Sequence, residues 1–205
     1  MLAWYDWLVL FLSCRFAWRC PSSVILDLYN RHITGNHLEV GVGTGYFLDR
    51  CRFPVPQPRL VLGDLNANCL AEAARRIARY SPRTIEANVL EPPALPEQRF
   101  DSIGLNFVLH CVPGSFPEKA CAFAHLASVL GPQGVLFGST ILAEGVSHTL
   151  ISRRLMAQYN QMRIFSNRRD SLDGLRAGLL SVFDDVEIST RGSVALFVAR
   201  RPKSR

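Results

Sequence analysis

The most informative part of this chain reads Leu38-Glu39-Val40-Gly41-Val42-Gly43-Thr44-Gly45-Tyr46-Phe47-Leu48. It begins as a short apolar strand with an acidic residue, continues with three glycines at alternate positions, and then becomes apolar again. Glycine tolerates positive φ and has no Cβ, so the backbone can turn sharply here and a ligand can approach it closely. Open α/β sheets bind nucleotides at such a loop between a strand and a helix. The pattern therefore predicts an adenosine-containing cofactor.

On both sides of this loop, segments with strand character alternate with segments of helical spacing. The predicted strands cover 38–42, 59–65, 83–89, 100–106, 135–142, 182–189 and 193–199. The predicted helices cover 22–32, 67–80, 116–130 and 171–181, another starts at Tyr46, and a turn is expected over 131–134. Such alternation predicts an α/β fold with a mostly parallel sheet, and the last two strands read as a pair with one antiparallel member.

Length and composition favour one globular domain over residues 1–205. The chain is 48% hydrophobic and 20% charged, which is ordinary for a protein with a real core. The apolar run 7–14 is only eight residues long, whereas a membrane-spanning helix needs roughly 20. No basic segment precedes it, as a signal peptide would require. We therefore expect a cytoplasmic protein without a membrane span, in which residues 1–20 form a cap or lid helix.

Charge and cysteine content exclude several other classes. The net charge is +6, from 23 basic and 17 acidic residues, but the basic residues are dispersed and form no run typical of nucleic-acid binding. The six cysteines form no C-x-x-C pair and have no histidine cluster beside them, so neither a metal site nor a disulfide framework is predicted. Scattered cysteines of this kind are typical of reduced thiols in the cytoplasm.

The glycine-rich motif resembles one family in particular. Glu39 to Gly45 matches the pattern acid-x-Gly-x-Gly-x-Gly of the class I S-adenosylmethionine-dependent methyltransferases, and the resemblance extends over about 24–200. A dinucleotide-binding protein would instead show G-x-G-x-x-G, with a wider gap before its third glycine. The resemblance implies a Rossmann-like, doubly wound sheet of seven strands whose last strand is antiparallel. It also implies S-adenosylmethionine as the cofactor.

The resemblance assigns the first part of a cofactor site to the glycine loop. Glu39 is suited to the cationic end of S-adenosylmethionine, and the loop itself would contact the cofactor through Gly41, Gly43 and Gly45.

The next two strands supply the rest of the cofactor site. Asp64 ends the second strand, 19 residues after Gly45, where a carboxylate can accept hydrogen bonds from both ribose hydroxyls; capping of the following helix is the alternative role. Leu65 would lie against the adenine. Asn88 stands where many family members have Asp, and its amide oxygen can reach the adenine amino group beside Val89.

Catalytic residues are harder to predict, because methyl transfer mainly requires alignment and exclusion of water. Asn106 ends the fourth strand and is a candidate for both cofactor contact and catalysis, and His110 follows it by about one helical turn. His110 could act as a general base, or it could be a structural histidine packed against the pocket.

Two further segments are candidates for the acceptor side. Tyr5 could bind the methionine carboxylate and assist catalysis, while Trp4 and Trp7 could contact the substrate and attract the sulfonium, although a cap helix with a buried aromatic face has the same pattern. The resemblance also implies that residues 143–169 form an insertion on the acceptor side. Its aromatic and basic residues suit a small, partly apolar molecule, with or without a carboxylate: Tyr159, Phe165, Arg153, Arg154 and Arg163.

The leading interpretation is a methyltransferase that acts on a small molecule of secondary metabolism, as a monomer or homodimer. Two alternatives keep the cofactor. One is a cyclase or lyase of the same fold that forms azetidine-2-carboxylate and methylthioadenosine from S-adenosylmethionine alone. The other is a non-catalytic partner subunit. The sequence does not separate methyl transfer from cyclisation.

Overall fold

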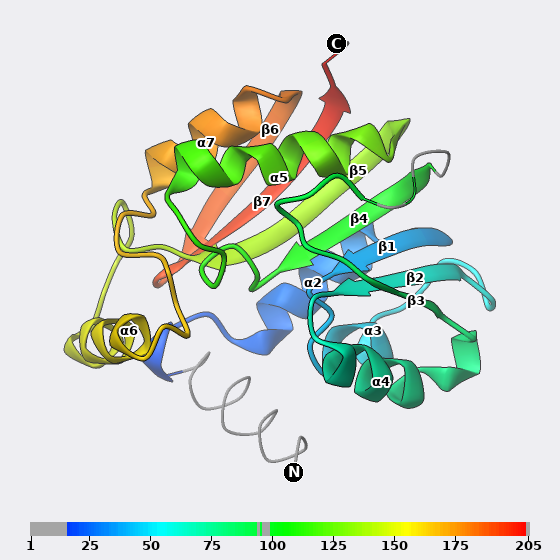
Figure 1. Cartoon of the computed structure of the whole chain (residues 1–205), viewed down its shortest axis with the longest axis horizontal. Helices are drawn as coiled ribbons and strands as arrows, with labels where there is room; N and C mark the ends of the chain where they lie inside the picture. Colours follow the sequence, from blue (N-terminus) through cyan, green and yellow to red (C-terminus); the bar gives the residue numbers. More distant parts are fainter. Residues whose placement is uncertain (1–15, 94, 96–98, 204–205) are drawn as a thin grey trace.

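A seven-stranded sheet forms the centre of the computed structural model, which describes residues 16–93, 95 and 99–203 (Figure 1). The strands are β1 (Asn36–Val40), β2 (Arg59–Asp64), β3 (Arg83–Glu86), β4 (Phe100–Asn106), β5 (Leu130–Ile141), β6 (Phe183–Arg191) and β7 (Val194–Pro202). Their order across the sheet is β3-β2-β1-β4-β5-β7-β6. β7 runs antiparallel to β5 and β6, and the other neighbouring pairs are parallel. The predicted doubly wound α/β class and its antiparallel last strand are confirmed.

Helices cover both faces of this sheet. They are α2 (Ser22–His32), α3 (Tyr46–Arg50), α4 (Ala67–Arg76), a 3₁₀ turn (Ala78–Tyr80), α5 (Phe116–Ser128), α6 (Leu150–Gln161) and α7 (Leu172–Leu180). α2, α3 and α4 lie on one face, and α5 and α7 lie on the other (Figure 1). α6 lies apart from both layers, beyond the carboxyl ends of β4 and β5 in this view.

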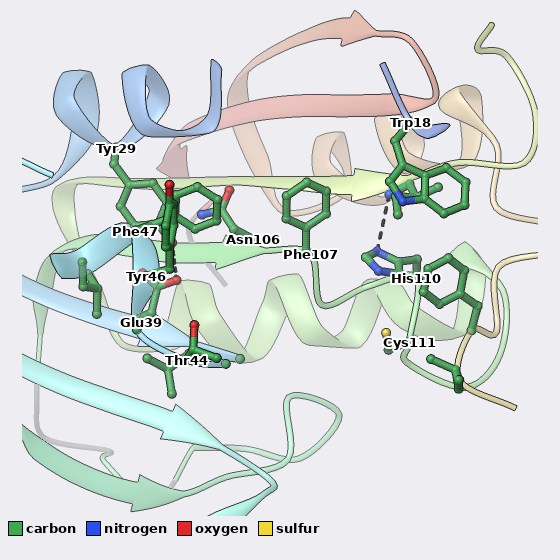
Figure 2. Close-up of a pocket in the computed structure, with 18 of the residues that line it drawn as sticks. Trp18, Tyr29, Glu39, Thr44, Tyr46, Phe47, Asn106, Phe107, His110 and Cys111 are labelled. Atoms are coloured by element: carbon green, nitrogen blue, oxygen red, sulfur yellow. Dashed lines mark hydrogen bonds between the residues drawn. The ribbon is translucent and has the colours of Figure 1, made fainter. Parts of the chain in front are cut away.

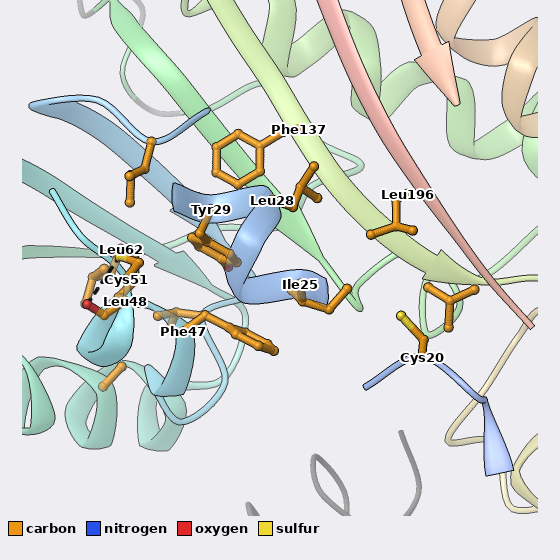
Figure 3. Close-up of a cluster of buried hydrophobic side chains, with 14 of the residues drawn as sticks. Cys20, Ile25, Leu28, Tyr29, Phe47, Leu48, Cys51, Leu62, Phe137 and Leu196 are labelled. Atoms are coloured by element: carbon orange, nitrogen blue, oxygen red, sulfur yellow. Dashed lines mark hydrogen bonds between the residues drawn. The ribbon is translucent and has the colours of Figure 1, made fainter. Parts of the chain in front are cut away.

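Along the buried strands, successive side chains belong alternately to two hydrophobic clusters, one under each layer of helices. Leu60 and Leu62 of β2 belong to the cluster under α2, α3 and α4, whereas Val61 between them belongs to the cluster under α5 and α7. Figure 3 shows part of the first cluster, in which Tyr29 of α2 lies near Phe47 and Phe137. Successive side chains of a strand point to opposite faces, so a strand buried on both faces is apolar throughout.

Several predicted boundaries differ from the observed ones by one to three residues, and three further predictions were wrong for local reasons. Residues 131–134, expected as a turn, lie within β5 as a bulge, because the register steps from Phe100 opposite Leu130 to Ser102 opposite Val135. β3 ends at Glu86 rather than at 89, because the Asn88 side chain turns the backbone by accepting the Leu90 N–H. α4 ends at Arg76, and the rest of the predicted helix continues as the 3₁₀ turn.

The order of the strands locates the site. Connections run outward from β1 to β2 and β3 on one side, and from β4 to β5 on the other, so the chain reverses its direction across the sheet between β1 and β4. Ligands of open α/β sheets bind beyond the carboxyl ends of the strands at this reversal. The glycine loop follows β1 there, and the segment from Phe107 to His110 follows β4.

Two other expectations concern the described part of the chain. No helix within it is both long and apolar enough to cross a bilayer. The five cysteines it contains, Cys20, Cys51, Cys69, Cys111 and Cys121, are all free thiols.

Candidate active site

A cavity of about 300 Å³ opens at the carboxyl ends of β1 and β4. One end is formed by the glycine loop with Tyr29, Glu39 and Asn106, and the other end is formed by Trp18 and His110 (Figure 2). Phe107 lies between the two groups in this view. The lining is mostly apolar with a few polar groups, as is typical of a small-molecule site.

The three glycines of the loop have different structural reasons to be glycine. Gly41, Gly43 and Gly45 all have positive φ, at 72°, 54° and 73°. A Cβ at Gly41 would overlap the Val108 side chain, and one at Gly45 would lie 3.1 Å from the Ala73 Cα. A Cβ at Gly43 would meet no atom within 4 Å. Gly41 and Gly45 therefore allow the protein to pack, while Gly43 leaves the backbone open to a ligand.

Glu39 is a buried carboxylate with two donors already bound. It is 2% exposed, and its oxygens accept from the Tyr29 hydroxyl at 2.5 Å and from His37 Nε2 at 2.9 Å. His37 Nδ1 lies 2.8 Å from the Ser102 hydroxyl. Burial and the Glu39 charge raise the pKa of Tyr29 well above its usual value, so the phenol stays protonated and donates. Gly104, opposite Glu39 on β4, leaves the space that the carboxylate occupies.

Asn106 presents an unpaired polar group at the cavity. The residue is 6% exposed, its Oδ1 accepts from the Ser139 hydroxyl at 3.0 Å, and its Nδ2 has no hydrogen-bond partner within the described structure. A serine hydroxyl can donate or accept, so the amide can turn either its nitrogen or its oxygen toward the cavity. A buried amide without a partner costs about 1–3 kcal/mol, so this position favours a ligand with a polar group.

His110 is neutral and held by its neighbours. Its Nδ1 accepts the Ile141 N–H at 3.4 Å, and its ring centroid lies 4.5 Å from that of Phe165. Burial lowers the pKa of His110 to about 3, and the Lys119 charge acts in the same direction. Because Nδ1 is the acceptor, the ring proton lies on Nε2. This ring is therefore a hydrogen-bond donor at neutral pH, and its low pKa makes it a weak base.

The predicted ribose and adenine residues lie outside the cavity lining, at the more open ends of β2 and β3. Asp64 accepts the N–H of Asn66 at 2.9 Å and that of Gly43 at 3.4 Å, which fixes the carboxylate beside the glycine loop. Asn66 itself caps α4 by accepting the Asn68 N–H. Leu65 is 66% exposed. An exposed leucine beside a fixed carboxylate leaves an apolar surface that a flat ring can cover.

Asn88 uses both ends of its amide within the protein. Its Oδ1 accepts the Leu90 N–H at 3.1 Å, and its Nδ2 donates to Glu91 at 2.9 Å. Val89 follows it, half-buried, and its carbonyl lies 3.4 Å from His125 Nδ1. The pairing of β2 with β3 brings this turn beside Asp64.

Aromatic residues from distant parts of the chain form the end of the cavity that lies away from the glycine loop, the predicted acceptor end. Phe165 is buried, and its ring centroid lies 5.0 Å from that of Tyr159 and 5.8 Å from that of Trp18. The structure thus brings Tyr159 and Phe165 into one wall. Trp4, Tyr5 and Trp7 lie outside the described residues. Sequence reasoning missed Trp18 and Tyr29, because neither belongs to a local motif.

A buried polar network fixes this wall. The Asn167 side chain donates to the Ile141 carbonyl at 2.9 Å and accepts from Asn160 of α6 at 2.8 Å. The Ser166 N–H donates to the His110 carbonyl at 2.7 Å. These bonds join α6, the end of β5 and the segment after β4, so the polar asparagines hold the aromatic wall in position.

A buried ion pair connects α5 to the same segment. Lys119 Nζ lies 2.6 Å from Asp170 Oδ2, both side chains are 0% exposed, and Lys119 also donates to the Ser166 carbonyl at 2.9 Å. No group of three or more histidine, cysteine or acidic side chains in the described ranges lies close enough to hold a metal ion.

Comparison with known proteins identifies the fold and the family. Residues 38–136 match the family model of the methyltransferase domain. The chain is 43% identical to demethylluteothin O-methyltransferase of Streptomyces thioluteus, covering 95% of this chain and 85% of that protein. It is 42% identical to methyltransferase ctvB of Aspergillus terreus, covering 99% and 91%.

A solved structure agrees in fold at much lower sequence identity. The DhpI–SAH complex superposes with a TM-score of 0.67 at 16% identity, covering 99% of this chain and 92% of that one. The sheet order, the glycine loop after β1 and the two relatives lead to one conclusion: this chain is an enzyme of the class I S-adenosylmethionine-dependent methyltransferase family.

Proposed function

We propose that this enzyme transfers the methyl group of S-adenosylmethionine to an oxygen atom of a small, partly apolar molecule of secondary metabolism. One observation carries the proposal: a single cavity joins the glycine loop to an aromatic wall made by Trp18, Tyr159 and Phe165. The similarity to an O-methyltransferase named for demethylluteothin supports oxygen as the acceptor atom and a small molecule as the substrate.

The residues present fit S-adenosylmethionine. Asp64 is positioned to bind the ribose, with Leu65, Asn88 and Val89 around the adenine. Gly43 gives the open backbone beside the methionine part, and Gly41 and Gly45 shape the turn. When bound, the sulfonium supplies an activated methyl carbon that needs only an aligned nucleophile.

Glu39 and Asn106 would hold the amino-acid end of the cofactor. Glu39 is a buried carboxylate with spare lone pairs, and Asn106 has at the cavity an amide nitrogen that forms no hydrogen bond of good geometry but lies near the Tyr29 hydroxyl. Tyr29 keeps the carboxylate oriented through its hydroxyl. This combination suits a ligand that carries both an ammonium and a carboxylate.

The other residues would orient the acceptor and exclude water. The Nε2–H of His110 is a donor next to the aromatic wall, where it can hold the acceptor oxygen. Phe107 and Phe165 keep the space between cofactor and acceptor apolar. Positioning of this kind supplies much of the rate enhancement in a displacement reaction. We assign Asn106 and His110 to catalysis, with Tyr5 as a further candidate, and we keep residues 1–20 as the lid and 143–169 as the acceptor side of one domain.

Product analysis by mass spectrometry tests the proposal. The protein is incubated with S-adenosylmethionine, with and without demethylluteothin as the first acceptor probe. We expect S-adenosylhomocysteine and a methylated acceptor only when the acceptor is present. If methylthioadenosine and azetidine-2-carboxylate form without an acceptor, the enzyme is a cyclase and not a methyltransferase. Cofactor binding detected by calorimetry without any product would leave the partner-subunit alternative, and no cofactor binding at all would overturn the proposal.

A further inference from the structure

A second, basic pocket adjoins the acceptor end of the cavity. It has a volume of about 430 Å³ and is lined by Arg163, Arg168 and Arg169 with Asn160, Cys111 and Phe165 among others. Cys111 and Phe165 also line the first cavity, so the two spaces meet at these residues. Cys111 lies directly beside His110 at that end of the cavity (Figure 2).

The arginines of the basic pocket lack acidic partners. Neither Arg163 nor Arg168 forms a side-chain hydrogen bond or ion pair with any described residue. Arg169 acts on Glu118 only at longer range, and the Glu118 carboxylate is bound at 2.6 Å by the Ser115 N–H. Cys111 is an exposed thiol whose pKa is raised from its usual value, so it adds no negative charge at neutral pH.

The backbone that carries these arginines is held in place. α6 ends just before Arg163, which has a φ of 59°, and the N–H groups of Ile164 and Phe165 both bond to the Tyr159 carbonyl. Ser166 is bonded to His110 and to Lys119. A guanidinium on a fixed backbone loses less freedom when it binds a planar anion in a two-point contact.

We propose that the basic pocket binds a carboxylate of the acceptor, so that the substrate class is an apolar, flat molecule with an anionic end. This proposal rests on the proposed function, because it requires the first cavity to hold the body of the acceptor. The carboxylate would lie between Arg163 and Arg168, the apolar body against Phe165 and Trp18, and the hydroxyl near His110. The anion would then fix which oxygen of the acceptor faces the methyl donor.

A matched pair of probes tests this assignment. The affinities of 2-naphthoate and 2-naphthamide, which differ in charge but hardly in shape, are measured by calorimetry on the full chain saturated with S-adenosylhomocysteine. We expect naphthoate to bind about tenfold more tightly, because charge-assisted two-point hydrogen bonds are strong. Added salt should reduce this ratio.

Variants locate the effect. Arg163→Gln/Arg168→Gln should bring the ratio close to one, while Arg31→Gln/Arg176→Gln, which removes the same charge from exposed positions on α2 and α7, should keep it. A ratio near one in the unmodified protein, or one that the first double variant leaves unchanged, would overturn the proposal. Binding of S-adenosylhomocysteine alone and methyl transfer to demethylluteothin are measured separately, so failure of the proposed function is recognised independently.

Discussion

The two ends of the cavity are built in different ways. At the cofactor end, the eleven consecutive residues 38–48 supply most of β1, the glycine loop and the start of α3. At the acceptor end, side chains come from four separate places, including Trp18, His110, Tyr159 and Phe165. The first end is therefore specified mostly by one local segment, to which tertiary packing adds Tyr29 and Asn106, whereas the second end depends on tertiary packing for all of its parts.

This difference affects how each end responds to change. A substitution in the glycine loop acts where we propose that the cofactor binds. The acceptor wall is held in place by Asn160, Asn167 and Lys119, none of which lines the first cavity. Substitution of these supporting residues therefore acts on the wall through the stability of the fold. We therefore expect substitutions in the glycine loop to lower mainly the affinity for the cofactor. Substitutions that affect the support of the acceptor wall should lower mainly the folding stability.

The largest effect is expected from Lys119→Met. Removal of the ammonium leaves Asp170 buried without its partner, which should lower the free energy of unfolding by about 3–5 kcal/mol. Urea denaturation measures this loss. Lys119→Met/Asp170→Asn removes both charges and should recover more than half of it. Equal loss in the single and double variants would show that the charge pair does not stabilise the acceptor wall.

The second effect concerns the cofactor end alone. Asp64→Ala removes a fixed, half-exposed carboxylate, and we expect the Kd for S-adenosylhomocysteine to rise about 30-fold while the affinity for 2-naphthoate changes little. Isothermal titration calorimetry measures both. Asp49→Ala, which removes a carboxylate of α3 that is paired with Arg79, is the matched control and should keep the cofactor affinity. An unchanged Kd in Asp64→Ala would mean that the ribose lies elsewhere.

The third prediction uses the protonation of His110. Its pKa is about 3 in the folded protein and about 6.5 in the unfolded chain, so the unfolded state binds more protons between these values. Stability should therefore fall as the pH falls from 6.5, by about 1.5 kcal/mol at pH 5 from this residue. Urea denaturation at both pH values should show a smaller decrease for His110→Gln. An identical pH dependence in the two proteins would contradict a neutral, buried imidazole.

What the sequence could predict follows the same division. Apolar runs and short-range spacing predict the strands of the sheet, its antiparallel last strand and the glycine loop. Each such run or spacing involves only a few neighbouring residues. Asn106 was found because it ends a recognisable strand. Tyr29 and Trp18 could not be found, because each becomes part of the site only when α2 and the preceding segment pack beside β1 and β5. The charge state of His110 likewise depends on burial, which no local pattern records.

The smallest effect on stability is expected from Gly43→Ala, and it tests whether a purely local feature can serve the ligand alone. Because Gly43 has positive φ, alanine should cost about 1 kcal/mol of unfolding free energy, but its Cβ meets no protein atom within 4 Å. The fold should therefore remain intact. The added alanine methyl group should occupy the space of the cofactor, so calorimetry should detect no binding of S-adenosylhomocysteine. Gly41→Ala, whose Cβ would overlap Val108, should instead lose clearly more stability. Equal destabilisation by the two substitutions would mean that all the glycines serve packing, and the cofactor end would then be as dependent on tertiary contacts as the acceptor end.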